Sequence, residues 1–435
     1  MLSGMFKKAS LGAVGGSGGS RSRGADLRDL VPNFVQGSDQ SFRKLRANIE
    51  KEDDVFYAEQ LTRVAKLGEG GFGVVYKCKL EAKGRVLEDY VVASGNMVAV
   101  KQLKSRAQIL QEHLSQGLPP SDAPSLHERV AAQHTDAMHE FAHEVLMLKK
   151  LKHPNVIGYI GCAVFTVGGS EELALVLEFS EHGSLKEMIT APSKMARAFT
   201  VSEGLRWACD IASGMAFLHR CIPPIIHRDL KPANIMLCGP SRIAKVADFG
   251  LASLEISKLK DEARSLSIKA ARSASSTNLE AMAGGGGGGS GGAKGVPPTG
   301  GVGSLRYMAP ENFRGEAYTH TVDQYSFAVI MYELLMRERA YEGMFLSAES
   351  IAEGAASARA LRPPVPAAWP EEVTRLLAAC WHADPGRRPP FKEVATAIGA
   401  MLDGSDEAAR QKLLKKLAAG SKRGILEKMG ITKSV

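Results

Sequence analysis

The sequence lacks an apolar run long enough to cross a membrane. The nearest candidate, Ser326 to Met336, is short and contains Glu333, whereas a spanning helix needs roughly 18 or more apolar residues. Hydrophobic residues nevertheless make up 44% of the 435-residue chain, enough for a sizeable buried core. A soluble protein without a transmembrane segment is therefore predicted.

Cysteine is scarce, and no two cysteines have the spacing of a redox pair or a zinc site. The six are scattered along the chain as Cys78, Cys162, Cys209, Cys221, Cys238 and Cys380. Such a distribution is typical of reduced thiols in a reducing compartment, and we expect a cytoplasmic location. The alternative is an organelle such as the chloroplast, because residues 1–25 are basic, rich in Gly and Ser and free of acid, as in transit peptides.

The central part of the chain also lacks an excess of basic charge. The net charge is +8, but residues 1–25 hold four basic residues and no acid, and residues 404–435 hold eight basic residues against three acids. These two ends account for the whole excess, so they are interpreted as solvated tails. A nucleic-acid partner is not expected.

What the sequence does contain is one dense polar stretch, which reads His227-Arg228-Asp229-Leu230-Lys231-Pro232-Ala233-Asn234, with Asp248-Phe249-Gly250 downstream. Two short strand-like runs, 235–237 and 243–247, flank a turn between these motifs and predict a hairpin. The hairpin would bring Asn234 beside Asp248, and oxygen ligands of this kind suit Mg²⁺. Asp229 could accept a proton from an attacking hydroxyl.

A second motif is rich in glycine and reads Gly68-Glu69-Gly70-Gly71-Phe72-Gly73. It lies between the strand-like runs 61–67 and 74–80, so the glycines join two strands and do not open a helix. This context argues against a dinucleotide-dependent oxidoreductase, in which a helix follows the glycines. Backbone amides in such a loop can close over phosphates.

A buried-type strand, 97–101, ends in Lys101, and an apolar stripe at helical spacing begins at Met138. Two acids lie on the same side of that helix, Glu140 and Glu144, and either could pair with the lysine. Between the strand and the helix, residues 105–136 contain three prolines, which we interpret as a surface spacer that costs little loop entropy.

Together, these motifs resemble those of eukaryotic protein kinases over residues 59–403. The resemblance extends to the segment 303–311, to Val322-Asp323, to Cys380-Trp381 and to residues 388–391. It implies an α+β, two-lobed fold with a β-rich N-lobe at 59–177, a hinge at 178–183 and a mostly helical C-lobe at 184–403. Residues 1–58 would be a disordered or targeting region, and 404–435 a basic tail in which 408–418 form an amphipathic helix.

The resemblance also implies a role for each polar residue. Lys101, held by Glu144, would fix the α and β phosphates of ATP, while Asn234 and Asp248 would bind Mg²⁺. Asp229 would accept the hydroxyl proton, and Lys231 would neutralise charge on the phosphoryl group. The remaining nucleotide contacts are expected at Gly68, Glu69, Gly70, Gly71, Phe72, Gly73, Val75, Ala99, Leu177, Glu178, Ser180, Ser184 and Met236. For Ser184, a helix N-cap is an equally good role, and Arg388 is expected to pair with Glu311.

The predicted function is ATP-dependent phosphorylation of Ser/Thr on protein substrates in signalling, by an enzyme similar to Raf-like or mixed-lineage-like members of the tyrosine-kinase-like branch. A dual-specificity kinase is the alternative for substrate class. A pseudokinase normally lacks one of Lys101, Asp229, Asn234 or Asp248, and all four are present. A binding module acting through the tails and inserts could coexist with catalysis.

Regulation is expected in the segment after Gly250, which carries an insert at 255–300 rich in Gly and Ser and predicted to be flexible. Arg228, beside Asp229, would await a phosphate, with Thr299 as the predicted site and an upstream kinase as a candidate partner. Ser304 belongs to the same regulatory segment.

Overall fold

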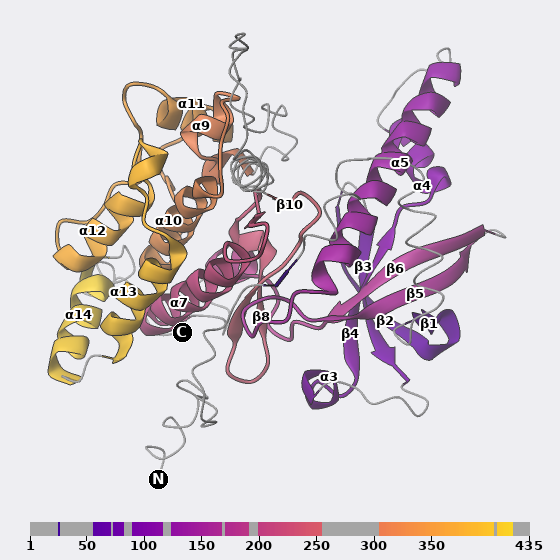
Figure 1. Ribbon diagram of the computed structural model, residues 1–435, viewed down its shortest axis with the longest axis horizontal. Coiled ribbons are helices and arrows are strands. Elements are labelled where there is room, and N and C mark those ends of the chain that lie inside the picture. The colour runs from indigo at the N-terminus through magenta and orange to yellow at the C-terminus, as the bar shows by residue number, and fades with distance from the viewer. Residues whose placement is uncertain are drawn as a thin grey trace, which may run out of the picture.

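The structure, a computed structural model, describes residues 25–26, 55–70, 73–81, 89–115, 123–167, 170–190, 199–254, 304–403 and 407–420. The predictions for Gly71, Phe72, Thr299 and the 255–300 insert lie outside these residues. The described chain forms two lobes, one built on a sheet with helix α5 and one mostly helical (Figure 1). The predicted α+β, two-lobed architecture is confirmed.

The smaller lobe is built on a six-stranded sheet in the order β1-β5-β6-β4-β3-β2. Among the described strands of this sheet, β1 pairs with β5 in parallel and the other pairings are antiparallel. Alternate residues of β4 face a core that includes Val98, Val100 and Val176. The strands are β1 Val55–Tyr57, β2 Leu61–Glu69, β3 Gly73–Leu80, β4 Met97–Leu103, β5 Tyr159–Val167 and β6 Ser170–Glu178. Because β1 belongs to the sheet, the domain begins before residue 59, and that predicted boundary is wrong.

Helix α5 (Ala123–Leu148) covers one face of the sheet through Phe141 and Val145. The shorter helix α4 (Arg106–Ser115) packs against its N-terminal half around Ile109, Leu126 and Val130. Much of the stretch interpreted as a spacer is therefore a helical hairpin, because its apolar residues recur at helical spacing and bury one another. Helix α3 (Asp89–Ala93) precedes β4.

The larger lobe is organised around helix α10 (Thr321–Met336), which is buried from Val322 to Met336. A helix that is apolar on all sides is stable only when other elements surround it. Helices α7 (Val201–Leu218), α11 (Ala348–Ala356), α12 (Glu371–Cys380) and α13 (Phe391–Asp403) form the body around it, with the short α6 (Leu185–Thr190) and α9 (Pro310–Phe313). Two small antiparallel strand pairs complete the lobe: the hairpin of β8 (Ile235–Cys238) with β9 (Ile243–Val246), and the pair of β7 (Ile225–Ile226) with β10 (Ser253–Leu254).

Residues outside the predicted limits of the domain, 59 and 403, also pack against the larger lobe. Helix α14 (Glu407–Gly420) buries Leu413 and Leu417 in the core, so the packed structure does not end at residue 403. At the other end of the chain, the Ile222 amide donates to the Ala25 carbonyl at 2.9 Å. Residue 25 is thus anchored on the lobe, which the prediction of a disordered or targeting region did not anticipate.

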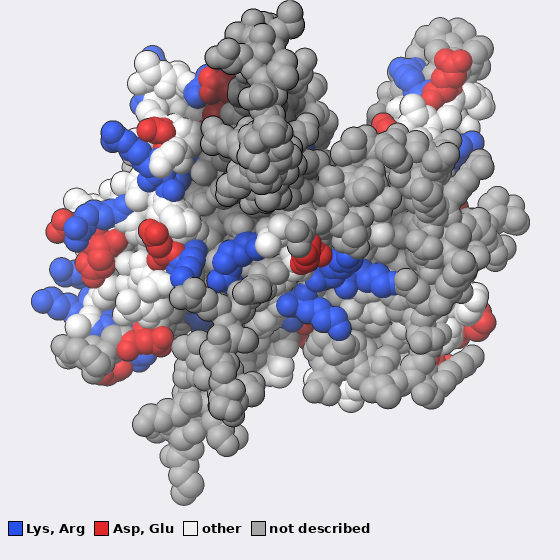
Figure 2. All heavy atoms as spheres, in the orientation of Figure 1, with Lys and Arg blue, Asp and Glu red and all other residues white. Residues whose placement is uncertain are grey.

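The described surface carries both signs of charge. On the face shown in Figure 2, basic and acidic side chains alternate over the helical lobe. No helix within the described ranges is both long and apolar enough to span a membrane. All six cysteines are free thiols, and five of them are buried.

Candidate active site

The β8–β9 hairpin brings the two candidate metal ligands together, as predicted. Ile235 pairs with Val246 in the ladder, and the Ala247 amide donates to the Asn234 carbonyl at 2.9 Å. The Asn234 side-chain nitrogen donates to the backbone carbonyl of Asp229 at 2.9 Å and to its Oδ2 at 3.1 Å. The nitrogen end of the amide is therefore engaged, which leaves the amide oxygen as the group suited to a metal ion.

Lys101 joins the two lobes at this site. Its Nζ lies 2.7 Å from Glu144 Oε2 and 3.0 Å from Asp248 Oδ1. Burial alone would lower the pKa of Lys101, but these two carboxylates outweigh it and raise the pKa above its ordinary value. Lys101 in turn holds the pKa of Asp248 below its ordinary value.

The structure distinguishes between the two acids on α5. Glu144, with a side chain 2% exposed, makes the ion pair with Lys101 and also accepts from the Phe249 amide at 3.3 Å. Glu140 lies one turn earlier, near Gly250. Burial, with further contributions from Asp248 and Glu144, raises the pKa of Glu140 to about 7 even though Lys101 opposes the shift. Glu144 is therefore the partner of the lysine, as the kinase resemblance implied.

The glycine-rich loop joins β2 to β3, which run antiparallel. A Cβ at Gly73 would lie 2.6 Å from the Gln102 carbonyl oxygen on β4, so this glycine is required by the close approach of two strands. At Gly68 and Gly70, an added Cβ would meet no atom within 4 Å. The described part of the loop thus has open space beside its backbone.

The catalytic-loop side chains converge on Asp229. Lys231 Nζ lies 2.6 Å from Asp229 Oδ2 and 2.9 Å from Ser304 Oγ. Ser304 opens the 3-10 helix η6 (Ser304–Tyr307), 73 residues further along the chain. The lysine therefore links the residue expected to take the proton to the segment expected to position the substrate.

Asp323 holds the backbone of the loop that carries Asp229, and it was not predicted as part of the site. Its carboxylate, 1% exposed, accepts from the backbone amides of His227 at 2.9 Å and Arg228 at 3.0 Å. His219 Nε2 lies 2.9 Å from the same carboxylate. Burial alone would raise the pKa of Asp323, but the hydrogen bonds and charges of His219 and His227 keep it below its ordinary value. Apart from the resemblance of Val322-Asp323 to the kinase pattern, the sequence signal was an acid in the first turn of an apolar helix.

The Arg228 backbone has φ +66°, a conformation that a non-glycine residue adopts only when its surroundings hold it there. Its guanidinium donates to the carbonyls of Leu251 and Ala252, just after Asp248-Phe249-Gly250. Arg228 therefore contacts the start of the segment that we expect it to regulate.

Several of the residues predicted to contact the nucleotide are paired with one another across neighbouring strands or bridges. Val75 pairs with Lys101, Ala99 with Leu177, and Met236 with Ser184.

The hinge side chains themselves make structural contacts. Glu178 pairs with Lys245 at 2.7 Å, and Ser180 Oγ donates to the Leu237 carbonyl at 2.8 Å. The Ser184 amide donates to Glu187 Oε2 at 2.7 Å, while Ser184 Oγ accepts from the Glu187 amide at 3.4 Å. This reciprocal pair caps α6, so the structure shows the alternative role given for Ser184.

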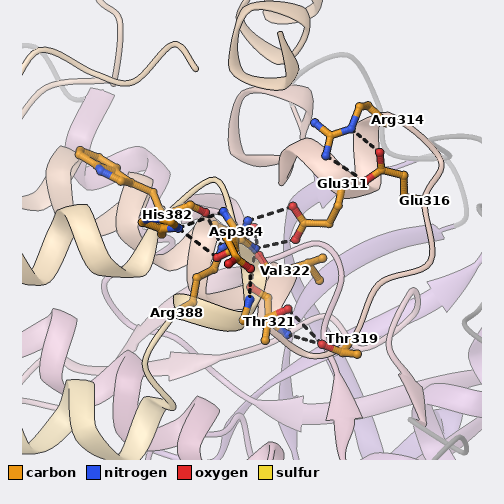
Figure 3. A network of polar contacts seen from close by, with 12 residues as sticks. Glu311, Arg314, Glu316, Thr319, Thr321, Val322, His382, Asp384 and Arg388 are labelled. Atoms are coloured by element: carbon orange, nitrogen blue, oxygen red, sulfur yellow. Dashed lines mark hydrogen bonds and ion pairs between the residues drawn. The ribbon is translucent and has the colours of Figure 1, made fainter. Parts of the chain in front are cut away.

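The predicted pair of Glu311 and Arg388 is confirmed. The guanidinium binds both carboxylate oxygens, at 2.6 and 2.9 Å, and the two side chains are 4% and 0% exposed. Arg388 also donates to the carbonyls of Thr321 and His382 (Figure 3). This pair fixes the end of the 304–311 segment to the stretch between helices α12 and α13, which carries Arg388.

Comparisons with known proteins agree with this geometry. Residues 128–274 and 296–398 match the family model described as protein tyrosine and serine/threonine kinase. The chain is 30% identical to the serine/threonine-protein kinase STY17 of Arabidopsis thaliana over 287 residues, which cover 66% of this chain and 41% of that protein. It is 31% identical to the probable serine/threonine-protein kinase drkC of Dictyostelium discoideum over 272 residues, covering 61% and 30%. The dual specificity protein kinase shkB of the same organism is 28% identical over 354 residues, covering 80% and 42%. The chain thus spans less than half the length of these curated relatives.

Proposed function

The chain belongs to the protein tyrosine and serine/threonine kinase family, and from this premise we propose that it is an ATP-dependent protein kinase that phosphorylates Ser/Thr on protein substrates. The observation that supports the proposal most strongly is the pairing of Lys101 with both Glu144 and Asp248, at 2.7 and 3.0 Å. The three residues come from β4, α5 and the loop that follows β9, so the pairing joins the two lobes.

The family implies the use of ATP and a divalent metal, and the residues present fit both. Open space lies beside Gly68 and Gly70, Lys101 lies in register with Val75, which pairs with Gly68, and the oxygens of Asn234 and Asp248 form a hard donor set. Bound Mg²⁺ would neutralise charge on the phosphates. Lys101, kept cationic by its two carboxylates, would orient the α and β phosphates.

In the reaction, the substrate hydroxyl oxygen forms a bond to the γ-phosphorus while the bond between that phosphorus and the β–γ bridging oxygen breaks, releasing ADP. Asp229 takes the hydroxyl proton. Lys231, 2.6 Å from Asp229, supplies positive charge where the transferred group passes. Asp323 keeps the backbone of the loop in place during these steps.

The preference for Ser/Thr is supported by Lys231, whose Nζ is 2.9 Å from Ser304 Oγ, and by the names of STY17 and drkC. Dual specificity is the second candidate, because shkB bears that description. Incubation with Mg²⁺ and γ-labelled ATP, with casein as acceptor, followed by phosphoamino-acid analysis, separates the two. We expect phosphoserine and phosphothreonine; phosphotyrosine among the products would favour the second candidate, and no label at all would refute the enzyme assignment.

We also propose that phosphorylation of the segment after Gly250, with Thr299 as the site and an upstream kinase as a partner, regulates the enzyme through Arg228. The contacts of this arginine with the Leu251 and Ala252 carbonyls support the idea, because a phosphate could compete for the same cation. If Thr299→Ala retains full activity after incubation with ATP, the proposal fails.

A further inference from the structure

A buried lysine outside the reaction scheme lies between the glycine-rich loop and the inserted helix α4. Lys104 directly follows β4, and its side chain is 6% exposed. Its Nζ lies 3.1 Å from Glu69 Oε1 and also pairs with Glu112 on α4. Because burying a charged group is costly unless it is paired, Lys104 depends on both carboxylates, and each carboxylate is held in place by it.

Glu69 belongs to the phosphate-binding loop, between Gly68 and Gly70. Its carboxylate pairs with Lys66 as well as with Lys104. The hydrogen bonds from Lys66 and Lys104 lower the pKa of Glu69 to about 2, so the carboxylate is ionised throughout the physiological range. Since an added Cβ at Gly68 or Gly70 would meet no neighbour within 4 Å, the loop has little packing at these two positions. In addition to the backbone pairing of β2 with β3, the carboxylate of Glu69 thus gives this part of the loop a side-chain attachment.

Glu112 lies on α4, which also packs against α5, the helix that carries Glu144. Ile109 of α4 packs with Leu126 and Val130 of α5, and α5 continues without a break to Glu144. The same hairpin is thus connected to the phosphate site in two ways, through Glu112 and Lys104 to the glycine-rich loop and through α5 to Lys101.

We propose that Lys104 is a positioning residue that ties Glu69, and with it the described residues Gly68 to Gly70, to the inserted helix α4, so that this helix affects how tightly the protein binds the phosphates of ATP. The inference rests on the proposed function, because it presupposes that the loop binds ATP. Lys104 acts through Glu69 and does not itself touch the nucleotide. A purely structural role for Lys104 would lower stability and leave nucleotide affinity unchanged, so affinity is the property to measure.

The test is a double-mutant cycle on the full chain with Glu112→Gln, Glu69→Gln and the combination, using Mg²⁺-ATP as the ligand and calorimetry to obtain Kd. We expect Glu112→Gln to raise Kd about threefold to tenfold, the effect of losing one ordinary hydrogen bond, because Glu112 acts on the loop only through Lys104 and Glu69. The double variant should be little weaker than Glu69→Gln alone, because both changes cut the same link. Lys104→Met should raise Kd as Glu112→Gln does, and Lys104→Arg should restore most of the affinity. The KM for ATP should rise with Kd while kcat stays within about twofold.

Glu128→Gln is the matched control, because Glu128 is an exposed acid on the same hairpin. It should leave Kd unchanged, and thermal unfolding of each variant reveals any loss of folding. Equal Kd for wild type and Glu112→Gln, or additive effects in the double variant, would overturn the inference while the proposed function stands. A wild-type protein that does not bind Mg²⁺-ATP would overturn both.

Discussion

The pair of Glu311 and Arg388 yields the sharpest stability prediction. Arg388→Ala removes a guanidinium that makes four hydrogen bonds, two to Glu311 and one each to the Thr321 and His382 carbonyls (Figure 3). The Glu311 side chain is 4% exposed, so it would remain as a buried carboxylate without its cation. Breaking a buried pair in this way costs about 3–5 kcal/mol.

For a unit of this size, each kcal/mol lowers Tm by about 2–4 °C, so Arg388→Ala should lower Tm by roughly 6–20 °C. The assay is urea and thermal unfolding of the full chain. Arg387→Ala is the matched control, because the neighbouring arginine is 72% exposed and lies 3.7 Å from Asp384. A surface pair of that kind contributes about 0–1 kcal/mol.

A second comparison separates the charge from the packing. Replacing both partners, Arg388→Met with Glu311→Leu, leaves no unpaired charge, so the double variant should be more stable than the sum of the two single losses predicts. The reasoning is refuted if Arg388→Ala costs no more than Arg387→Ala, or if the two single losses simply add.

Three further predictions concern the site and its support. Gly73→Ala places a Cβ 2.6 Å from the Gln102 carbonyl oxygen and should destabilise the smaller lobe by about 1–3 kcal/mol in thermal unfolding; an unchanged Tm would contradict the close approach. Asp323→Asn replaces one of the two carboxylate oxygens with an NH2 group, so that only one of the His227 and Arg228 amides keeps its acceptor, and it should lower kcat about 100-fold with little change in the KM for ATP; a kcat near that of wild type would remove Asp323 from the account. Burial raises the pKa of Glu333 from 4.5 to about 7, so the stability linked to this group is present below pH 4.5 and is lost as the pH rises through 7. Glu333→Gln should flatten that part of the pH–stability curve by up to about 3 kcal/mol, and an identical curve for both proteins would show that Glu333 does not titrate there.

Local patterns predicted the parts of the site that lie close together in the chain. Two strand-like runs around a tight turn were sufficient to place Asn234 beside Asp248, because a hairpin leaves few choices of register. The choice between Glu140 and Glu144 could not come from periodicity, since both lie on one helix face. It depends on how α5 is rotated against the sheet, which the kinase resemblance supplied and the ion pair with Lys101 confirms.

Contacts between distant segments were beyond local reasoning. Asp323 lies 96 residues from His227 along the chain, and nothing near either residue indicates the pairing. The α4–α5 hairpin was missed because Pro119, Pro120 and Pro124 suggested broken structure. Pro124 is in fact the second residue of α5, and a proline is tolerated in the first turn of a helix because the amide it lacks has no partner there.

The central claim is that the protein transfers the γ-phosphoryl group of ATP, with Asp229 accepting the hydroxyl proton and Asp248 binding Mg²⁺. The most direct measurement is the rate of phosphate incorporation into casein, with saturating Mg²⁺-ATP, by the wild type, Asp229→Asn and Asp248→Ala. The account predicts transfer by the wild type, a loss of about 100-fold to 10,000-fold for Asp229→Asn and no detectable transfer by Asp248→Ala. Equal incorporation by all three proteins would contradict it.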